Sequence, residues 1–378
     1  MPENIKLEIN NIGPIHNASI DLAKLNIIGG ANSSGKSTSS RLLFCFLFSS
    51  SRDGDDYYQN LIASTDNKAS VSEDGASTDS MDRNEEFIEV MYKIFLSEFD
   101  YSPVDSDYGI GTASFKGTAD ENNNDFDWNL YVGQDLSGTE IEKNDENPVF
   151  LGNVVYLDSI SPLEVIRLKD NLNIPYHFRS LFNKLSYKSD RKVSLEEKER
   201  LAVFQEKVNE ILGGKFEYDF ERESDDEKGF KFKRGDVSFS MKNSSSGLKQ
   251  IGTIQMLLNN NQLLENDFLI IDEPQVNLHP EWQVKLAEIL VLLVKELNIT
   301  IYINSHSPHF IEALEVYSVK YHLEDETHFY MSELDEESNK YDLRELYYSN
   351  IRELYRNLGS PYDEINKVRL ENNLRGLR

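Results

Sequence analysis

The 378-residue sequence has a single cysteine, few basic residues and no long hydrophobic run. One cysteine excludes an internal disulfide, and Cys45 lies in the apolar run Leu42–Phe48, where a thiol usually packs as a small hydrophobe. That run is far shorter than the about 20 residues needed to cross a bilayer, and the N-terminus lacks a basic segment followed by an apolar one. We therefore expect a cytoplasmic protein without a membrane partner.

The charge is strongly acidic. The chain has 39 basic and 66 acidic residues and a formal net charge of −27, which repels polyanions. This excludes a general nucleic-acid coat, and we expect any nucleic-acid binding by the chain alone to be weak. Ser49–Ser80, rich in Ser, Asp, Gly and Asn, predicts an exposed, mobile insertion. The locally basic stretch Arg179–Arg200 is more typical of a solvated helix face than of a binding groove.

The N-terminal pattern predicts a hairpin that leads into a strand, a glycine-rich loop and a helix. Ile5–Ile9 and Ile15–Leu22 alternate apolar and polar residues around a Gly-Pro turn, which is typical of a hairpin. Lys24–Ile28 is a short apolar run that ends at two glycines, and Lys36–Phe48 has helical character. The order of strand, loop and helix is that of a phosphate-binding unit.

Periodicity predicts the remaining elements. Helices are expected at residues 83–99, over most of 163–212, and at 248–258, 281–297 and 308–314. Strands are expected at residues 113–116, 126–132, 154–158, 216–220, 230–232, 237–241, 268–271, 300–304 and 319–322. The C-terminal segment is expected to be helical, with breaks at Gly359–Pro361. The alternation of helices and strands after residue 248 predicts an α/β fold.

The loop GGANSSGKST, Gly29–Thr38, contains the pattern G-x-x-x-x-G-K-[ST]. In such a loop, backbone N–H groups wrap a phosphate at a helix N-terminus and glycines permit its close approach. Lys36 would neutralise the β- and γ-phosphates, and Ser37 would bind Mg²⁺. A chance Gly-rich turn would not require the flanking strand and helix. We predict a phosphate site formed by Gly30, Asn32, Ser33, Ser34, Gly35, Lys36, Ser37 and Thr38.

Two later apolar strands end in polar residues. In FLIIDEPQVNLHP, Asp272 can hold Mg²⁺ through water, and Glu273 can polarise an attacking water as a general base. Alone, this pair would be an ordinary strand end with solvated acids, but the phosphate loop favours catalysis. In IYINSHSPHF, His306 can reach a γ-phosphate. A helix-capping turn at Ser307 explains the same residues, and both interpretations can hold.

A serine-rich turn precedes the acidic strand in NSSSGLKQIGTIQMLL, Asn243–Leu258. Taken singly, it predicts only a helix N-cap. Its place before the acidic strand gives it further meaning, because hydroxyl and N–H groups at a helix N-terminus can form a second anion site.

These four elements, in this order, resemble the ATP-binding-cassette ATPase superfamily, and within it the AAA-type ATPases of the overcoming-lysogenization-defect and RecF-like group. KLEINNIGPIHNASIDLAKLNIIGGANSSGKS looks like that group's opening, and SSSGLKQ looks like its signature motif. IIDEPQVNLHP looks like its Walker B strand and dimer loop, and NSHSPHF like its switch histidine. The resemblance spans residues 4–48 and 240–325 and implies ATP and Mg²⁺ as cofactors.

The resemblance also implies roles for single residues. They are ATP and Mg²⁺ binding by Lys36 and Ser37, metal support by Asp272, general base catalysis by Glu273 and switching by His306. Ser245 and Gly247 would contact the γ-phosphate bound by a second subunit, so a site would be complete only between head-to-tail subunits of a homodimer or higher homo-oligomer. Two departures stand out: the signature lacks the Leu-Ser-Gly-Gly-Gln wording of transporters, and no Q-loop glutamine can be placed.

The expected architecture is an α/β fold of the ATP-binding-cassette P-loop type, a mixed sheet flanked by helices, with a mostly helical insertion. The ATPase core would comprise residues 1–48 and 213–330. Residues 49–150 would form an acidic, partly mobile insertion with antiparallel strands, residues 151–212 a strand plus a helical insertion, and residues 331–378 a helical tail.

The expected function is an ATP-hydrolysing switch that acts through nucleotide-dependent dimerisation. By analogy with the related group, it would regulate a separate effector, a nuclease or toxin, in a bacterial or archaeal defence system. The alternative is a DNA-repair or recombination ATPase that clamps DNA, supported only by Arg179–Arg200. A third hypothesis is a scaffold that holds ATP without hydrolysing it. The presence of Glu273 and His306 argues against this hypothesis. The tail lacks a second metal-ligand pattern, so we expect no nuclease within the chain.

Overall fold

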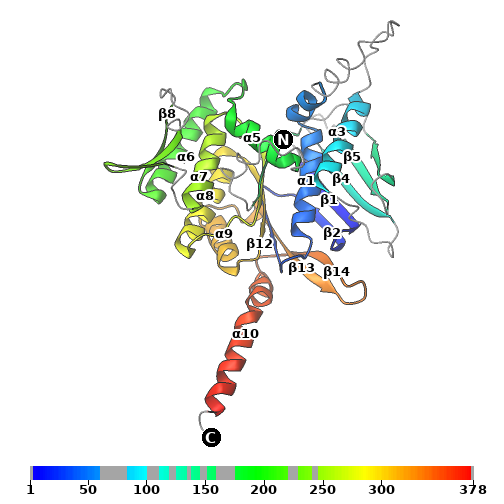
Figure 1. The fold of residues 1–378 in the computed structure, drawn as a ribbon, viewed down its shortest axis with the longest axis vertical. Coiled ribbons are helices and arrows are strands. Elements are labelled where there is room, and N and C mark those ends of the chain that lie inside the picture. The colour runs from blue at the N-terminus through cyan, green and yellow to red at the C-terminus, as the bar shows by residue number, and fades with distance from the viewer. Residues whose placement is uncertain are drawn as a thin grey trace, which may run out of the picture.

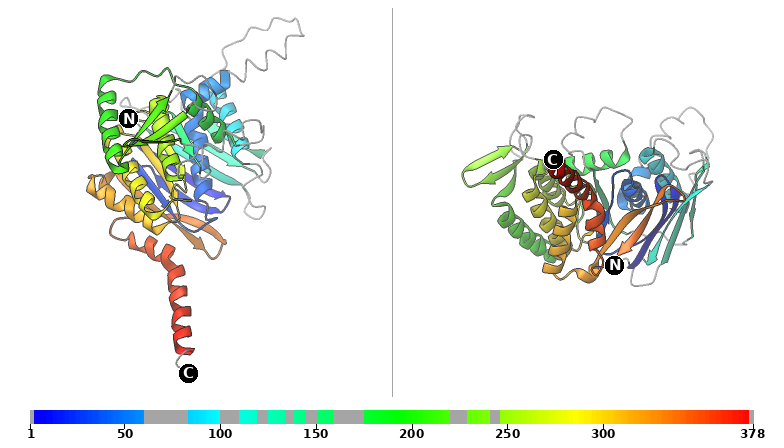
Figure 2. Two further views of the ribbon diagram at one scale, coloured as in Figure 1. Left: turned by 60° about the vertical axis from the view of Figure 1, so that its left-hand side comes forward. Right: turned by 90° about the horizontal axis from the view of Figure 1, so that it is seen from below.

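The computed structural model describes residues 3–59, 83–99, 110–118, 125–133, 138–144, 151–158, 175–219, 229–240 and 246–375. The chain is built around one large mixed sheet with helices on both faces (Figures 1 and 2). The predicted α/β fold, a mixed sheet flanked by helices, is confirmed.

The N-terminal hairpin and the strand–loop–helix unit form as predicted. β1 (Glu3–Ile12) and β2 (Ile15–Asp21) pair in antiparallel register and bury alternate side chains. β3 (Leu25–Gly29) follows and is buried throughout, and α1 (Lys36–Ser49) begins after the glycine-rich loop.

Four parallel strands bring the ends of the motif strands to one edge of the sheet. β7 (Val154–Leu157), β11 (Phe268–Asp272) and β12 (Thr300–Ser305) run parallel to β3, in the order β3-β12-β11-β7. Nearly every residue of these strands is buried, as is typical of parallel strands covered by helices on both faces. Their carboxyl ends therefore share the edge at which α1 begins.

Part of the predicted insertion 49–150 belongs to the same sheet. β4 (Gly111–Thr118) pairs with β1 of the hairpin. β5 (Asp125–Val132) and β6 (Glu140–Lys143) continue the sheet beyond β4, and α3 (Arg83–Glu98) packs against α1. These strands extend the core sheet instead of forming a unit apart from it.

The prediction of an exposed loop from Ser49 is wrong at its start. Ser49, Ser50 and Ser51 are buried. Their hydroxyls donate to backbone carbonyls near the C-terminal end of α1 and so satisfy them where the helix ends. Residues 52–59 are helical. The rest of the predicted mobile segment, residues 60–80, lies outside the described residues.

The prediction of a helical tail from residue 331 is wrong for its first part. β13 (Thr327–Asp335) and β14 (Lys340–Leu346) form an antiparallel pair that inserts between β2 and β3. Local propensity misleads here, since Glu, Asp and Lys are depleted in strands. Contacts between the two strands stabilise them despite this low propensity. For example, the Arg344 guanidinium donates to the Glu333 carboxylate at 2.8 and 2.9 Å.

Two smaller predictions also differ from the structure. Residues 319–322, expected as a strand, are instead the last two residues of α9 (Pro308–Lys320) and a turn, because so short a segment fits helix and strand alike. α10 (Arg352–Arg375) continues through Gly359–Pro361, where breaks were expected, and projects from the body of the protein (Figure 1).

The sheet order is β6-β5-β4-β1-β2-β14-β13-β3-β12-β11-β7. The remaining elements are α5 (Tyr176–Ser186), α6 (Leu195–Leu212), α7 (Ser246–Asn259), α8 (Pro280–Leu297) and a small sheet of β8 (Lys215–Asp219), β9 (Gly229–Arg234) and β10 (Val237–Ser240).

The sheet separates two hydrophobic cores. One joins α5, α6, α7, α8 and α9 to one face, and the other joins α1 and α3 to the opposite face (Figure 1). On β12, for example, Ile301 and Ile303 belong to the first core and Tyr302 to the second. Within the described part of the chain, no helix combines the length and apolar character needed to cross a bilayer.

Candidate active site

The glycine-rich loop between β3 and α1 is a compact cradle. Gly35 has φ +90°, a conformation that L side chains rarely adopt. A Cβ on Gly30 would lie 1.7 Å from Ser332 Oγ, so only glycine fits there. α1 has no side-chain N-cap bond and no acidic residue in its first turn. The N–H groups at this helix end are therefore suited to an anion.

The other predicted loop residues surround this cradle. Asn32 and Ser33 are exposed, Ser33 with φ +62°, whereas Ser34 is buried and its hydroxyl has no hydrogen-bond partner. Thr38 lies under the hairpin turn, where its Oγ1 would be 3.3 Å from a Cβ placed on Gly13. A buried, unpartnered hydroxyl next to a free helix N-terminus fits a site that receives phosphate oxygens.

Lys36 is almost fully buried, with its ammonium turned back into the loop. Nζ donates to the carbonyl oxygens of Gly30 at 3.0 Å and Ala31 at 2.7 Å. It also lies 3.4 Å from Glu273 Oε1. The structure thus brings together the cation of the loop and the acid that follows β11, which lie far apart in the sequence.

Asp272 ends β11 next to the start of α1. It is buried and accepts hydrogen bonds from the Ser37 hydroxyl and, at 3.1 Å, from Asn304 Nδ2. Burial raises the pKa of Asp272, the bonds from Ser37 and Asn304 oppose that rise, and the nearby carboxylates of Asp158 and Glu273 add to it. A divalent cation would relieve this repulsion, so the site is chemically suited to one.

Asn304 is a central residue that sequence reasoning did not single out. Besides Asp272, its Nδ2 donates to the Lys36 carbonyl at 3.1 Å and to Ser40 Oγ at 2.9 Å, so it ties β12 to α1 and β11. Its Oδ1 is buried without a partner. The available signal was a polar amide at the end of an otherwise apolar buried strand.

Glu273 is held in an unusual position by its neighbours. Its φ of +52° is rare for a non-glycine residue, and its N–H donates to the Asn304 carbonyl at 3.0 Å. Its Oε2 accepts from Gln275 Nε2 at 2.5 Å and from the His306 N–H at 3.2 Å, and lies 2.7 Å from His306 Nδ1. Sequence reasoning found Glu273 and His306 but missed Gln275.

Of the two signature residues, only Gly247 can be placed. Ser245 lies outside the described residues. Gly247 is in the first turn of α7 and packs on Trp282, where an added Cβ would lie 3.2 Å from the indole ring. A larger residue at this position would therefore press against the Trp282 ring.

The described residues contain no group of three or more His, Cys, Asp or Glu side chains arranged to hold a metal ion. Ser37 and Asp272 supply only part of a coordination shell. This donor set fits Mg²⁺, which is commonly bound by one or two protein oxygens together with substrate phosphates and water.

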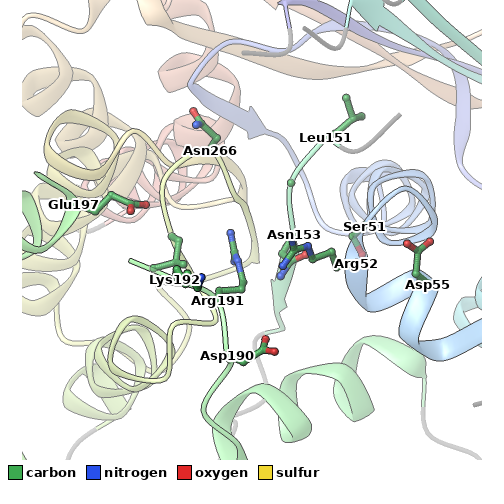
Figure 3. A pocket seen from close by; sticks show the side chains of 12 residues that line it. Ser51, Arg52, Asp55, Leu151, Asn153, Asp190, Arg191, Lys192, Glu197 and Asn266 are labelled. Atoms are coloured by element: carbon green, nitrogen blue, oxygen red, sulfur yellow. The ribbon is translucent and has the colours of Figure 1, made fainter. Parts of the chain in front are cut away.

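A separate polar cavity of about 1050 Å³ lies at the amino ends of β7 and β11, away from the phosphate loop. Figure 3 shows Arg52, Asn153, Arg191 and Lys192 around it. Arg191 forms two hydrogen bonds, of 2.5 and 2.9 Å, with Asp267, whose side chain is 1% exposed. Asp267 in turn accepts from two backbone N–H groups, so this ion pair joins several segments.

Arg191→Ala is expected to lower the free energy of unfolding by about 3–5 kcal/mol, because it leaves a buried carboxylate without its cation. Urea denaturation followed by circular dichroism measures the change. Lys192→Ala, at the exposed neighbour in the same cavity, should change it by less than about 0.5 kcal/mol. Equal midpoints for the two variants would show that backbone N–H groups alone satisfy Asp267.

Three solved structures are similar to this chain at low sequence identity. The SMC head domain from Thermotoga maritima is 12% identical, covering 91% of this chain and 98% of that chain, with a TM-score of 0.46. The SmcHead bound to the C-winged helix domain of ScpA is 13% identical (92% and 98% covered, TM-score 0.49). The Smc head domain with an extended coiled coil bound to the C-terminal domain of ScpA, derived from Pyrococcus furiosus, is 12% identical (98% and 100% covered, TM-score 0.47).

Curated proteins show no match to this sequence. Residues 156–311 match a family model described as an AAA ATPase domain. The matched segment begins in β7 and includes Asp272, Glu273 and His306, and the phosphate loop comes from the preceding part of the chain. Residues 156–311 are therefore similar to an AAA ATPase domain, which supports an ATPase.

Proposed function

We propose that this ATPase binds ATP with Mg²⁺ at the shared edge of β3, β11 and β12. The observation that carries the proposal is the convergence of Lys36, Asp272 and Glu273 within one hydrogen-bonded cluster. The loop residues Gly30 to Thr38 would surround the phosphates, and Lys36 would exchange its carbonyl partners for phosphate oxygens. Ser37 and Asp272 would hold Mg²⁺, which supplies charge neutralisation on the phosphates.

Glu273 is proposed as the general base for hydrolysis to ADP and phosphate. Its carboxylate would accept a proton as a water oxygen attacks the γ-phosphorus, and the bond to the leaving ADP oxygen would break. Gln275 and the His306 N–H orient the carboxylate, and their contacts with Oε2 leave Oε1 to face Lys36. His306, whose side chain is 42% exposed, would contact the γ-phosphate and respond to its loss.

The finer proposal is a switch of the overcoming-lysogenization-defect and RecF-like group. ATP would join two subunits head to tail, with Ser245 and Gly247 of one subunit on the γ-phosphate of the other, and hydrolysis would release them. The exposed tip of the phosphate loop at Asn32 and Ser33 is consistent with a site closed by a second subunit. The dimer would regulate a separate effector protein, a nuclease or toxin in a defence system.

A protein effector is favoured over a DNA clamp by the pairing of the basic stretch. Three of its cations are engaged by acids: Lys184 by Asp53, Arg191 by Asp267 and Arg200 by Glu265. Together with the net charge of −27, this pairing reduces the positive charge that the stretch can offer to a phosphate backbone.

Mixing Lys36→Ala with Ser245→Arg subunits tests the shared site. Each variant alone should hydrolyse little ATP, and the mixture should recover activity, because one of its two sites combines an intact loop with an intact signature. Phosphate release against total protein concentration is the measurement. Ser19→Arg is the control for Ser245→Arg. It adds the same side chain on the exposed face of β2, away from the signature turn, and so measures the effect of an added arginine by itself. A mixture of two folded variants that stays inactive would show that the signature turn acts only as an N-cap.

A further inference from the structure

A buried ionic chain links the strand next to Asp272 with two helices at some distance from the phosphate loop. His177, at the start of α5, has Nδ1 2.6 Å from Glu98 Oε2, and its backbone N–H donates to Glu98 Oε1 at 2.9 Å. Glu98 is the last residue of α3. His177 Nε2 lies 3.5 Å from Asp158 Oδ2, directly after β7. The side chains of His177 and Glu98 are fully buried, and that of Asp158 is 13% exposed.

The charges in this chain favour an imidazolium between two carboxylates. Burial lowers the pKa of His177, but Glu98 and Asp158 outweigh that effect and raise it. Arg41 of α1 is a second cation near the group, and its Nη1 donates to the Glu98 carbonyl at 3.4 Å. Arg41 lies in the field of Glu98, Asp158 and Asp272 together. A buried set of this kind holds its elements together through charge and geometry.

Asp158 also lies next to the proposed metal residue. β7 and β11 are parallel, with Leu157 opposite Ile271, so Asp158 and Asp272 follow as the next pair at the strand ends. Burial is the main cause of the raised pKa of Asp272, and the charge of Asp158 adds to it. Two positive charges can therefore attract the Asp158 carboxylate: the imidazolium of His177 on one side, and any cation bound at Asp272 on the other.

We propose that Asp158 is a positioning residue that couples nucleotide-bound Mg²⁺ at Asp272 to helices α3 and α5 through His177 and Glu98. This inference rests on the proposed function. A cation at Asp272 attracts Asp158 and weakens its contact with His177, which is the longer of the two contacts made by the imidazole. The short contact between His177 and Glu98 persists, so α3 and α5 respond as one unit.

Amide hydrogen exchange of the intact chain tests the coupling. A non-hydrolysable ATP analogue is added with Mg²⁺ or with EDTA, and exchange is followed in residues 83–98 and 176–186. We expect Mg²⁺ with the analogue to speed exchange in both helices of the wild-type chain. In Asp158→Asn this metal-dependent change should be lost, while a fluorescent ATP analogue still binds.

Two further variants make the test specific. Glu345→Gln removes the carboxylate from another histidine–carboxylate pair, at 3.7 Å from His328, and should leave the metal-dependent change intact. Glu98→Gln breaks the chain at its far end, so α5 should still respond and α3 should not. This variant also serves if Asp158→Asn does not fold, as judged by circular dichroism.

Three results would overturn the inference. The first is a metal-dependent change of exchange that persists in folded Asp158→Asn, and the second is such a change in α3 of Glu98→Gln. The third is a wild-type chain that binds the nucleotide analogue while exchange in α3 and α5 stays the same. Failure of the wild-type chain to bind the analogue would instead overturn the proposed function, and the coupling with it.

Discussion

Glu273→Gln should bind ATP and Mg²⁺ and yet hydrolyse ATP about 100-fold more slowly or worse, because an amide cannot accept the proton of the attacking water. The contacts around the side chain explain why binding survives. Gln275 and the His306 N–H both approach Oε2, and a glutamine carbonyl oxygen can accept both bonds. The contact with Lys36 loses its charge, which frees the ammonium for phosphate.

The variant should also accumulate as an ATP-bound dimer, since the step that releases the pair is blocked. Phosphate release gives the rate, and size-exclusion chromatography with light scattering gives the assembly state with and without ATP. Glu336→Gln makes the same chemical change in the exposed turn between β13 and β14 and should match the wild-type chain. A wild-type rate in Glu273→Gln would mean that another group activates the water.

Lys36→Ala should abolish ATP binding at ordinary nucleotide concentrations. The ammonium makes two hydrogen bonds inside the loop, and under the proposed function phosphate oxygens would replace these two partners. Losing two charge-assisted hydrogen bonds of about 1.5–3 kcal/mol each weakens binding by about 100-fold or more. Titration with a fluorescent ATP analogue measures the loss.

The control for this second variant is Lys295→Ala, an exposed lysine on α8 that should leave affinity unchanged. Thermal unfolding without nucleotide must show that Lys36→Ala folds, because the residue is buried and close to Glu273. Retained affinity in a folded variant would rule out the phosphate loop as the nucleotide site.

The parts of the site that the sequence predicts are those with a fixed spacing or a strong local pattern. The loop from Gly30 to Lys36 has a spacing that the turn itself sets. Asp272 and Glu273 stand at the end of a short, fully apolar run, which strongly predicts a buried strand. Gln275 lacks any such pattern, and for Asn304 a single amide at the end of an apolar strand is a weak signal. Their importance comes from contacts across the sheet, which periodicity in one segment does not encode.

The fold shows the same division between local and distant causes. The hairpin, β3 and α1 are contiguous in sequence, and their patterns sufficed to predict them. β13 and β14 are rich in charged residues and become strands because β2 and β3 leave a gap that they fill. Asp158 was missed as well, since its meaning depends on His177 and Glu98 from two other helices.

The insertion of β13 and β14 between β2 and β3 has a consequence for synthesis on the ribosome. β2 and β3 are made long before the pair that lies between them, so β14 joins β2 and β13 joins β3 only when residues 327–346 have been made. Until then each presents an open edge of unpaired backbone groups, which is a template for unwanted pairing with other chains. The nascent chain therefore has to protect its own phosphate-loop strand until residues 327–346 have been made, and contacts so distant in sequence slow its final closure.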